Sequence, residues 1–110
     1  MTNYVNSFNV TEPFSDKTAQ LALAAGAALT YTVPGNSSNS YKAEFSWPYN
    51  ANVWVGYNVT ATSPGAGTIT SNANIEFRPD FRFVRGGDVL SFISSAIVTD
   101  AGLRLMTLPG

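Results

Sequence analysis

The sequence contains no cysteine and no histidine, and these two absences exclude most of the chemistry available to small proteins. Without cysteine there is no disulfide framework, no thiolate nucleophile and no cysteine-ligated metal. Without histidine there is no Ser-His-Asp or Cys-His arrangement and no imidazole ligand for a metal. An enzyme would have to rely on carboxylates alone, so we expect a protein with no catalytic residues and no cofactor.

Charged residues are also scarce: they make up 12% of the 110 residues, and the net charge is -1. Soluble domains usually contain about 25%. The six basic and seven acidic side chains form no run of one sign, which argues against binding to nucleic acid or to an anionic membrane. Asparagine, serine and threonine supply 32 of the 110 residues instead. Such a surface suits a protein that packs against other proteins or works outside a cell.

Long apolar runs are missing as well. The longest apolar stretch, 21–29, is interrupted by Gly26 and is far shorter than the roughly 18–20 residues that span a bilayer. The first residues have no basic or apolar region, so no signal peptide is expected. The length fits one domain. Residues 1–16 lack periodicity and are expected to form an arm or irregular lead-in, packed on their own domain or reaching a neighbouring subunit. Residues 17–110 are expected to form the domain.

From residue 17 onward, apolar and polar residues alternate with a period of two, which predicts strands. The expected strands are 18–23, 29–33, 41–49, 53–60, 75–83, 88–93 and 103–107, with a possible short one at 68–72. Pro79 interrupts 75–83, which predicts an edge strand, a bulge or two short strands. Seven or eight strands without a substantial helix predict an all-β, compact antiparallel β-sandwich that is jelly-roll-like. An immunoglobulin-like sandwich is the close alternative.

The alternation assigns most aromatic side chains to the core, and one tryptophan stands apart. The core-facing set is Tyr41, Phe45, Trp47, Tyr57, Phe77, Phe81 and Phe83. Trp54 falls on the face opposite to Val53 and Val55. Three interpretations stay open for it: a covered position, an anchor for a protein partner, or a platform for a sugar ring.

The charged residues are densest between Glu76 and Arg82, where Arg78 and Asp80 lie on the same predicted face. Glu76 and Asp80 would be about 13 Å apart along one strand at ~3.3 Å per residue, which is too far for a glycosidase pair. The strip is either a solvated charge ladder or an interface strip, in which Arg78 and Arg82 fix the register of a partner.

Two other motifs carry little chemistry. Gly86-Gly87-Asp88 lacks the Lys-Ser/Thr and the helix of a phosphate-binding loop, so it predicts a turn in which Asp88 bonds to the turn's own backbone. The acidic residues are scattered and form no calcium-loop motif, so no metal is expected, although a calcium ion held by distant loops stays open.

Four stretches of the sequence resemble small structural proteins of tailed bacteriophages. They are LALAAGAALTYTVP (21–34), YKAEFSW (41–47), NVWV (52–55) and VRGGDVLSFI (84–93), together with the ending Leu108-Pro109. The resemblance covers roughly residues 20–109 and is one of general pattern. It implies a small β-sandwich or jelly roll that decorates the outside of a capsid as a cement or staple protein.

What the resemblance implies fits the residues. We expect a non-enzymatic virion protein on the outer capsid surface, whose partners are the major capsid protein and copies of itself, and which clamps adjacent capsomers. The candidate contact residues are Tyr4, Phe8, Phe14, Trp54, Arg78 and Arg82. The alternative is a carbohydrate-binding or receptor-recognition module of a phage fibre or tail, which would use Trp54.

Overall fold

The computed structural model describes residues 17–64 and 73–108, which form eight strands and no helix. The strands are β1 (Lys17–Leu23), β2 (Leu29–Thr32), β3 (Ser40–Ser46), β4 (Val53–Tyr57), β5 (Ile75–Phe77), β6 (Phe81–Arg85), β7 (Val89–Ser94) and β8 (Val98–Thr107). The all-β prediction is confirmed. The expected arm at 1–16 and the possible strand at 68–72 lie outside the described residues.

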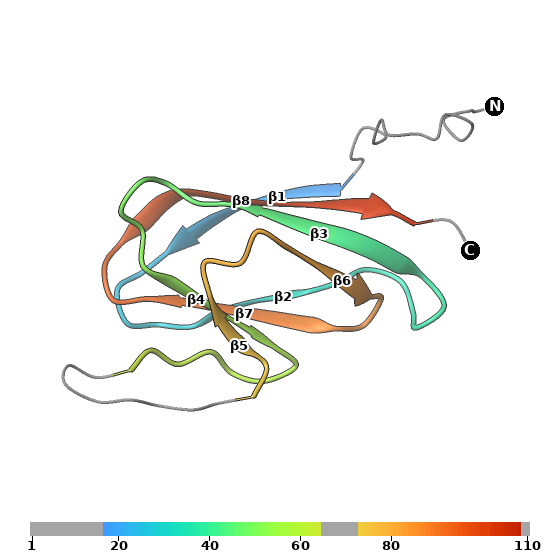
Figure 1. Ribbon diagram of the computed structural model, residues 1–110, viewed down its shortest axis with the longest axis horizontal. Helices are drawn as coiled ribbons and strands as arrows, with labels where there is room; N and C mark the ends of the chain where they lie inside the picture. Colours follow the sequence, from blue (N-terminus) through green and yellow to red (C-terminus); the bar gives the residue numbers. More distant parts are fainter. Residues whose placement is uncertain (1–16, 65–72, 109–110) are drawn as a thin grey trace.

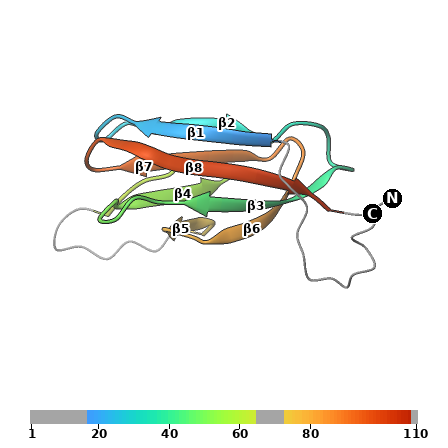
Figure 2. The same cartoon turned by 90° about the horizontal axis from the view of Figure 1, so that it is seen from above.

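The strands form two antiparallel four-stranded sheets packed face to face (Figures 1 and 2). The first sheet has the order β1-β8-β3-β6 and the second has the order β2-β7-β4-β5. The first half of the chain pairs with the second half in reverse: β1 with β8, β2 with β7, β3 with β6 and β4 with β5. A two-stranded antiparallel ribbon of four such pairs, rolled up on itself, is the jelly-roll arrangement.

Glycines at two turns allow the chain to pass between the sheets. Gly26, with φ +72°, lies between β1 and β2, and its N–H donates to the carbonyl of Ser94 at 2.8 Å. Gly87, with φ +92°, forms the turn between β6 and β7. Asp88 accepts the Arg85 N–H at 2.9 Å on its carboxylate, which confirms the predicted bond to the turn's own backbone.

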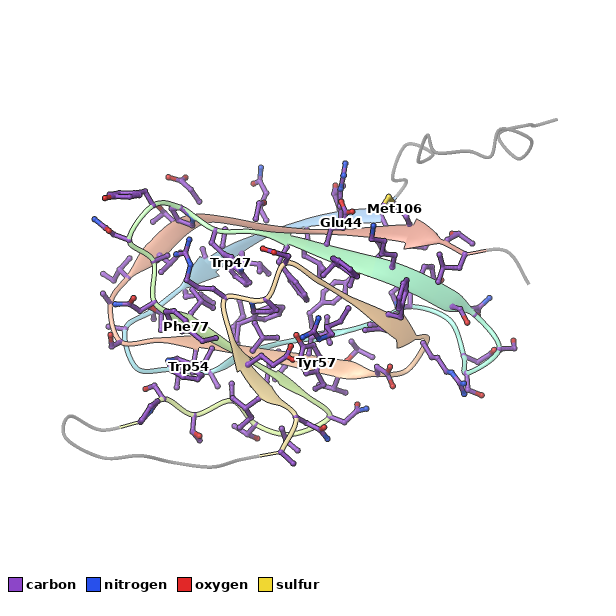
Figure 3. The ribbon with its side chains drawn as sticks, in the orientation of Figure 1. Glu44, Trp47, Trp54, Tyr57, Phe77 and Met106 are labelled. Carbon is purple, nitrogen blue, oxygen red and sulfur yellow. The ribbon has the colours of Figure 1, made fainter. Side chains whose placement is uncertain are left out.

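The core lies between the sheets and is made of the inward-facing residues of both. Its buried members are Leu21, Leu23, Val33, Tyr41, Ala43, Ala51, Val53, Val55, Val84, Leu90, Phe92, Val98, Ala101, Leu103 and Leu105. Phe92 is fully buried, and its ring centroid lies 6.2 Å from that of Phe45 and 6.4 Å from that of Trp47. Burying a side chain of this size stabilises the fold by about 1.5–3 kcal/mol. Figure 3 shows Trp47 between the two layers, as predicted.

The prediction that Phe77, Phe81 and Phe83 face the core is wrong. Their side chains are 46%, 41% and 67% exposed. The segment 75–83 is two strands in different sheets, because the chain crosses between the sheets at Arg78, which has φ +47°, and at Pro79. At this edge Glu76 and Arg82 point between the sheets and bond to each other, while the three phenylalanines point outward. Inward-pointing charges also protect edge strands from pairing with other chains.

The predicted alternation also runs too far at the end of β3. Alternation continued over 41–49 predicts Tyr49 on the same face as Tyr41 and Phe45, but β3 ends at Ser46 and Tyr49 is 90% exposed. Pro48 begins a turn in which the Ala51 N–H donates to the Pro48 carbonyl at 3.1 Å. The aromatic side chain therefore lies on the connection to β4, outside the pleat.

Candidate binding site

The outer face of the second sheet carries a row of apolar side chains across three neighbouring strands. Trp54 of β4 lies opposite Phe77 of β5 and opposite Ile93 of β7. Directly opposed residues of antiparallel strands point to the same side of a sheet. We call this set the Trp54 row (Phe77, Trp54 and Ile93). Figure 3 shows Trp54 and Phe77 side by side.

The backbone pairing brings Trp54 and Phe77 close together. The Arg78 N–H donates to Val53 and the Tyr57 N–H donates to Asn74, both at 2.9 Å. Trp54 and Phe77 lie between these bonds and form a non-hydrogen-bonded pair, in which side chains approach more closely. Their ring centroids are 4.9 Å apart with an interplanar angle of 50°.

The position of Trp54 falls between the interpretations that the sequence left open. Its side chain points away from the core, as the alternation predicts, but it is partly buried because Phe77 packs against it. Phe77 and Trp54 form one packed aromatic pair on the outer face of the sheet. Aromatic pairs of this kind are typical of protein contacts.

The loop that follows β4 covers the neighbouring part of the same face. Ala61 is buried, and its N–H donates to the Ser91 hydroxyl at 2.9 Å. The loop approaches β4 at Gly56, where a Cβ atom would lie 2.6 Å from the Val59 carbonyl oxygen. Residues 59–61 therefore cover this part of the second sheet, next to the Trp54 row.

The outer face of the first sheet is polar by comparison. Glu44 accepts a bond from Arg104 Nε at 2.7 Å, and its other oxygen lies 3.1 Å from Lys42 Nζ. Burial raises the pKa of Glu44, but the bonds from Arg104 and Lys42 outweigh it and hold the pKa below its ordinary value. Phe81 and Phe83 lie at the edge of this face, with Lys42 4.7 Å above the Phe81 ring. The outer face of the first sheet therefore resembles an ordinary solvated surface more closely than the outer face of the second sheet does.

A third group of side chains joins the edges of the two sheets. Arg82 of β6 donates to Glu76 of β5, and the Tyr57 hydroxyl of β4 donates to the other Glu76 oxygen at 3.0 Å. The bond from Arg82 holds the pKa of Glu76 below its ordinary value despite partial burial. Burial and then the bond to Glu76 raise the pKa of Tyr57. Glu76 is therefore ionised and Tyr57 protonated at neutral pH.

The predicted charged strip from Glu76 to Arg82 is split by the structure. Arg82 and Glu76 meet at the open edge, but Arg78 turns away. The Arg78 Nη1 donates to the carbonyls of Ala51 and Pro48, and the Trp47 Nε1 donates to Pro79 at 2.9 Å. Arg78 thus ties the β5–β6 connection to the β3–β4 turn, which leaves Arg82 and Trp54 as the described candidates that border open surface. Tyr4, Phe8 and Phe14 lie outside the described residues.

Other kinds of site find no candidates in residues 17–64 and 73–108. No group of three or more acidic residues there is placed to hold a metal ion. No helix long and apolar enough to cross a membrane occurs in the same part of the chain. Comparisons with protein-family models, with curated proteins and with solved structures found no match.

Sequence reasoning found Trp54 but missed its neighbours. Phe77 was assigned to the core and Ile93 was not singled out. The adjacency of Trp54, Phe77 and Ile93 depends on the pairing of β4 with both β5 and β7. A single sequence contains no signal for that pairing. The exposed position of Phe77 was hinted at only by Pro79, which marks the end of a strand.

Proposed function

We propose that this chain is a non-enzymatic virion structural protein that binds the outer surface of a capsid and stabilises the shell. The Trp54 row is the observation that carries the proposal. The solvent face of an antiparallel sheet is usually polar, and an apolar row across three strands of such a face is typical of a protein contact. The jelly roll occurs in capsid proteins and also in lectins, so the fold adds only analogy.

The row supplies the kind of contact that docking needs. Phe77 is 46% exposed and Trp54 is partly buried beside it, so a partner surface would complete the burial of both rings. Large aromatic side chains contribute most of the energy at many protein interfaces. A protein that binds the assembled shell and not its separated parts stabilises the shell by mass action.

The proposed partners are the major capsid protein and further copies of this chain. Oligomers around symmetry axes of a shell make several modest contacts at once, and avidity then provides strong attachment. One copy that spans two capsomers clamps them together. The polar outer face of the first sheet, with Lys42, Glu44 and Arg104, would then face solvent.

The test is to mix the purified protein with shells assembled without it. We expect co-sedimentation with the shells and a higher temperature of shell disruption. The proposal fails if the protein stays in the supernatant and leaves the heat resistance of the shells unchanged. Binding to a saccharide array that is lost in Trp54→Ala would instead support the receptor-recognition module.

A further inference from the structure

A cleft of about 380 Å³ opens where the two sheets part, between the edge strands β5 and β6. It lies within the usual size range of small-molecule sites, roughly 300–1,000 Å³. Val84 and Leu90, 5% and 0% exposed, are the buried core residues among those that line it. Figures 1 and 2 show β5 and β6 as neighbours at the same side of the sandwich.

Polar groups from both sheets line the same cleft. They include the pair formed by Glu76 and Arg82, with Tyr57 bonded to Glu76, and also Asn74 and Asp88. The Arg82 guanidinium donates to Glu76 and to the Phe81 carbonyl, and within the described residues these bonds use only part of its five-donor capacity. Each carboxylate oxygen of Glu76 receives one such bond and has a second lone pair.

The edge of β6 adds backbone groups beside the cleft. The Phe45 N–H donates to Asp80 at 3.0 Å, and the Gly86 N–H donates to Asn39 at 2.9 Å, both along the β3–β6 ladder. Hydrogen-bonded and non-hydrogen-bonded pairs alternate along an antiparallel ladder, and by this alternation Phe83 belongs to a non-hydrogen-bonded pair. Its N–H and carbonyl therefore point away from β3. Phe83 also borders the cleft and is 67% exposed.

The charges around the cleft decide which ligands it suits. An anion would meet the carboxylates of Glu76 and Asp88, and a cation would meet the guanidinium of Arg82. A neutral hydroxyl group can accept a bond from a guanidinium and donate one to a carboxylate at the same time. A sugar ring has hydroxyl groups around its rim and an apolar C–H face, so it matches a cleft whose lining includes charged side chains and the exposed Phe83.

We infer that the cleft between β5 and β6 is a binding site for a neutral saccharide, held at the mouth of the cleft by Glu76 and Arg82. This site is separate from the Trp54 row, which lies on the outer face of the second sheet. The inference goes beyond the proposed function and does not rest on it. A protein docked through the Trp54 row leaves this edge beside the contact, open to a ligand.

The experiment uses the full chain and a panel of neutral mono- and disaccharides at millimolar concentration, with ligand-observed NMR as the readout. We expect at least one saccharide to bind. Glu76→Gln and Arg82→Gln should weaken its binding by about tenfold, because each removes one charged hydrogen-bonding group. Glu44→Gln, which breaks an ion pair away from the cleft, is the matched control and should bind like the wild type.

A third variant tests the cleft even if Glu76→Gln and Arg82→Gln do not fold. Asn74 has φ +66°, and Asn74→Gly keeps that backbone conformation while removing the amide that borders the cleft. We expect weaker binding with an unchanged melting temperature. The inference is overturned if no saccharide in the panel binds, if the cleft variants that fold bind as well as wild type, or if Trp54→Ala alone abolishes binding. A failure of capsid binding would not affect this outcome, because the assay contains no capsid.

Discussion

Arg78 provides the most specific test of the assignment of side chains at the β5–β6 connection. Sequence alternation places Arg78 in a surface strip with Arg82, whereas in the structure it joins the β5–β6 connection to the β3–β4 turn. Its guanidinium donates to two carbonyls of the β3–β4 turn, those of Pro48 at 3.2 Å and Ala51. Ala51 is only 7% exposed, so water has little access to replace the lost donor.

The size of the effect follows from these two bonds. A hydrogen bond to a charged group contributes about 1.5–3 kcal/mol, and an acceptor left buried without a donor adds a desolvation cost. Although Ala51 is buried, both hydrogen bonds are only partly buried, so we take the lower end of the range, about 1.5 kcal/mol, for each. Arg78→Ala should therefore lower the free energy of unfolding by about 3 kcal/mol, which is a large share of the stability of a small domain.

A second variant separates the hydrogen bonds from the backbone conformation. Arg78 has φ +47°, a region that costs most residues about 1–2 kcal/mol and glycine little. Arg78→Gly should be more stable than Arg78→Ala by about 1 kcal/mol, yet still less stable than wild type. The exposed Arg85, at the end of β6, is the control, and Arg85→Ala should change stability by no more than about 0.5 kcal/mol.

The assay is equilibrium unfolding in urea, followed by the fluorescence of Trp47 and Trp54. A shift in the midpoint with an unchanged slope reports a change in stability alone. The reasoning is refuted if Arg78→Ala unfolds within about 0.5 kcal/mol of wild type. It is also refuted if Arg85→Ala is as destabilising as Arg78→Ala, because the two bonds of Arg78 would then have no special role.

Three further predictions concern the bonded group of Glu76, Arg82 and Tyr57 and the second sheet. The folded-state pKa of Glu76 lies below its ordinary value of 4.5, so its contribution is present above that pH and is lost as the pH falls through the folded pKa. The difference in melting temperature between wild type and Glu76→Gln should thus be constant at pH values well above 4.5 and shrink as the pH falls below 4.5. Tyr57→Phe should lower the free energy of unfolding by about 0.5–1.5 kcal/mol in urea titrations, and a stability equal to wild type would contradict its bond to Glu76. Gly56→Ala should destabilise by about 1–3 kcal/mol, because its Cβ would lie 2.6 Å from the Val59 carbonyl oxygen, and a neutral result in calorimetry would show that the 58–61 loop can move away.

Local patterns were sufficient to predict the strands where one face is buried along the whole strand. In β3 and β4 the buried residues Tyr41, Ala43, Val53 and Val55 repeat at every second position, so period and direction agree with the structure. The turn at Gly86-Gly87-Asp88 was predictable too, because its chemistry is local.

The edge of the sandwich was not predictable in the same way. Aromatic and charged residues alternate here with the predicted period of two, but the faces are exchanged. Phe77, Phe81 and Phe83 face solvent, and Glu76 and Arg82 face inward. Which side faces the core depends on the sheet that each strand joins, and β5 and β6 join different sheets. The ion pair between Glu76 and Arg82 appears only when those two edges meet. The candidate site depended on the same long-range pairing, so Trp54 was found and Phe77 was not.

Binding of two matched variants to shells assembled without this protein tests the central claim most directly. Phe77→Asp places a carboxylate in the Trp54 row. Phe83→Asp places a carboxylate on the first sheet, at the position of a phenylalanine that is more exposed than Phe77. Loss of a buried phenylalanine contact of about 1.5–3 kcal/mol corresponds to about 10- to 100-fold in affinity. We predict that Phe77→Asp weakens co-sedimentation by at least about tenfold and that Phe83→Asp binds like wild type. Equal binding by both variants, or a loss confined to Phe83→Asp, would contradict docking through the second sheet.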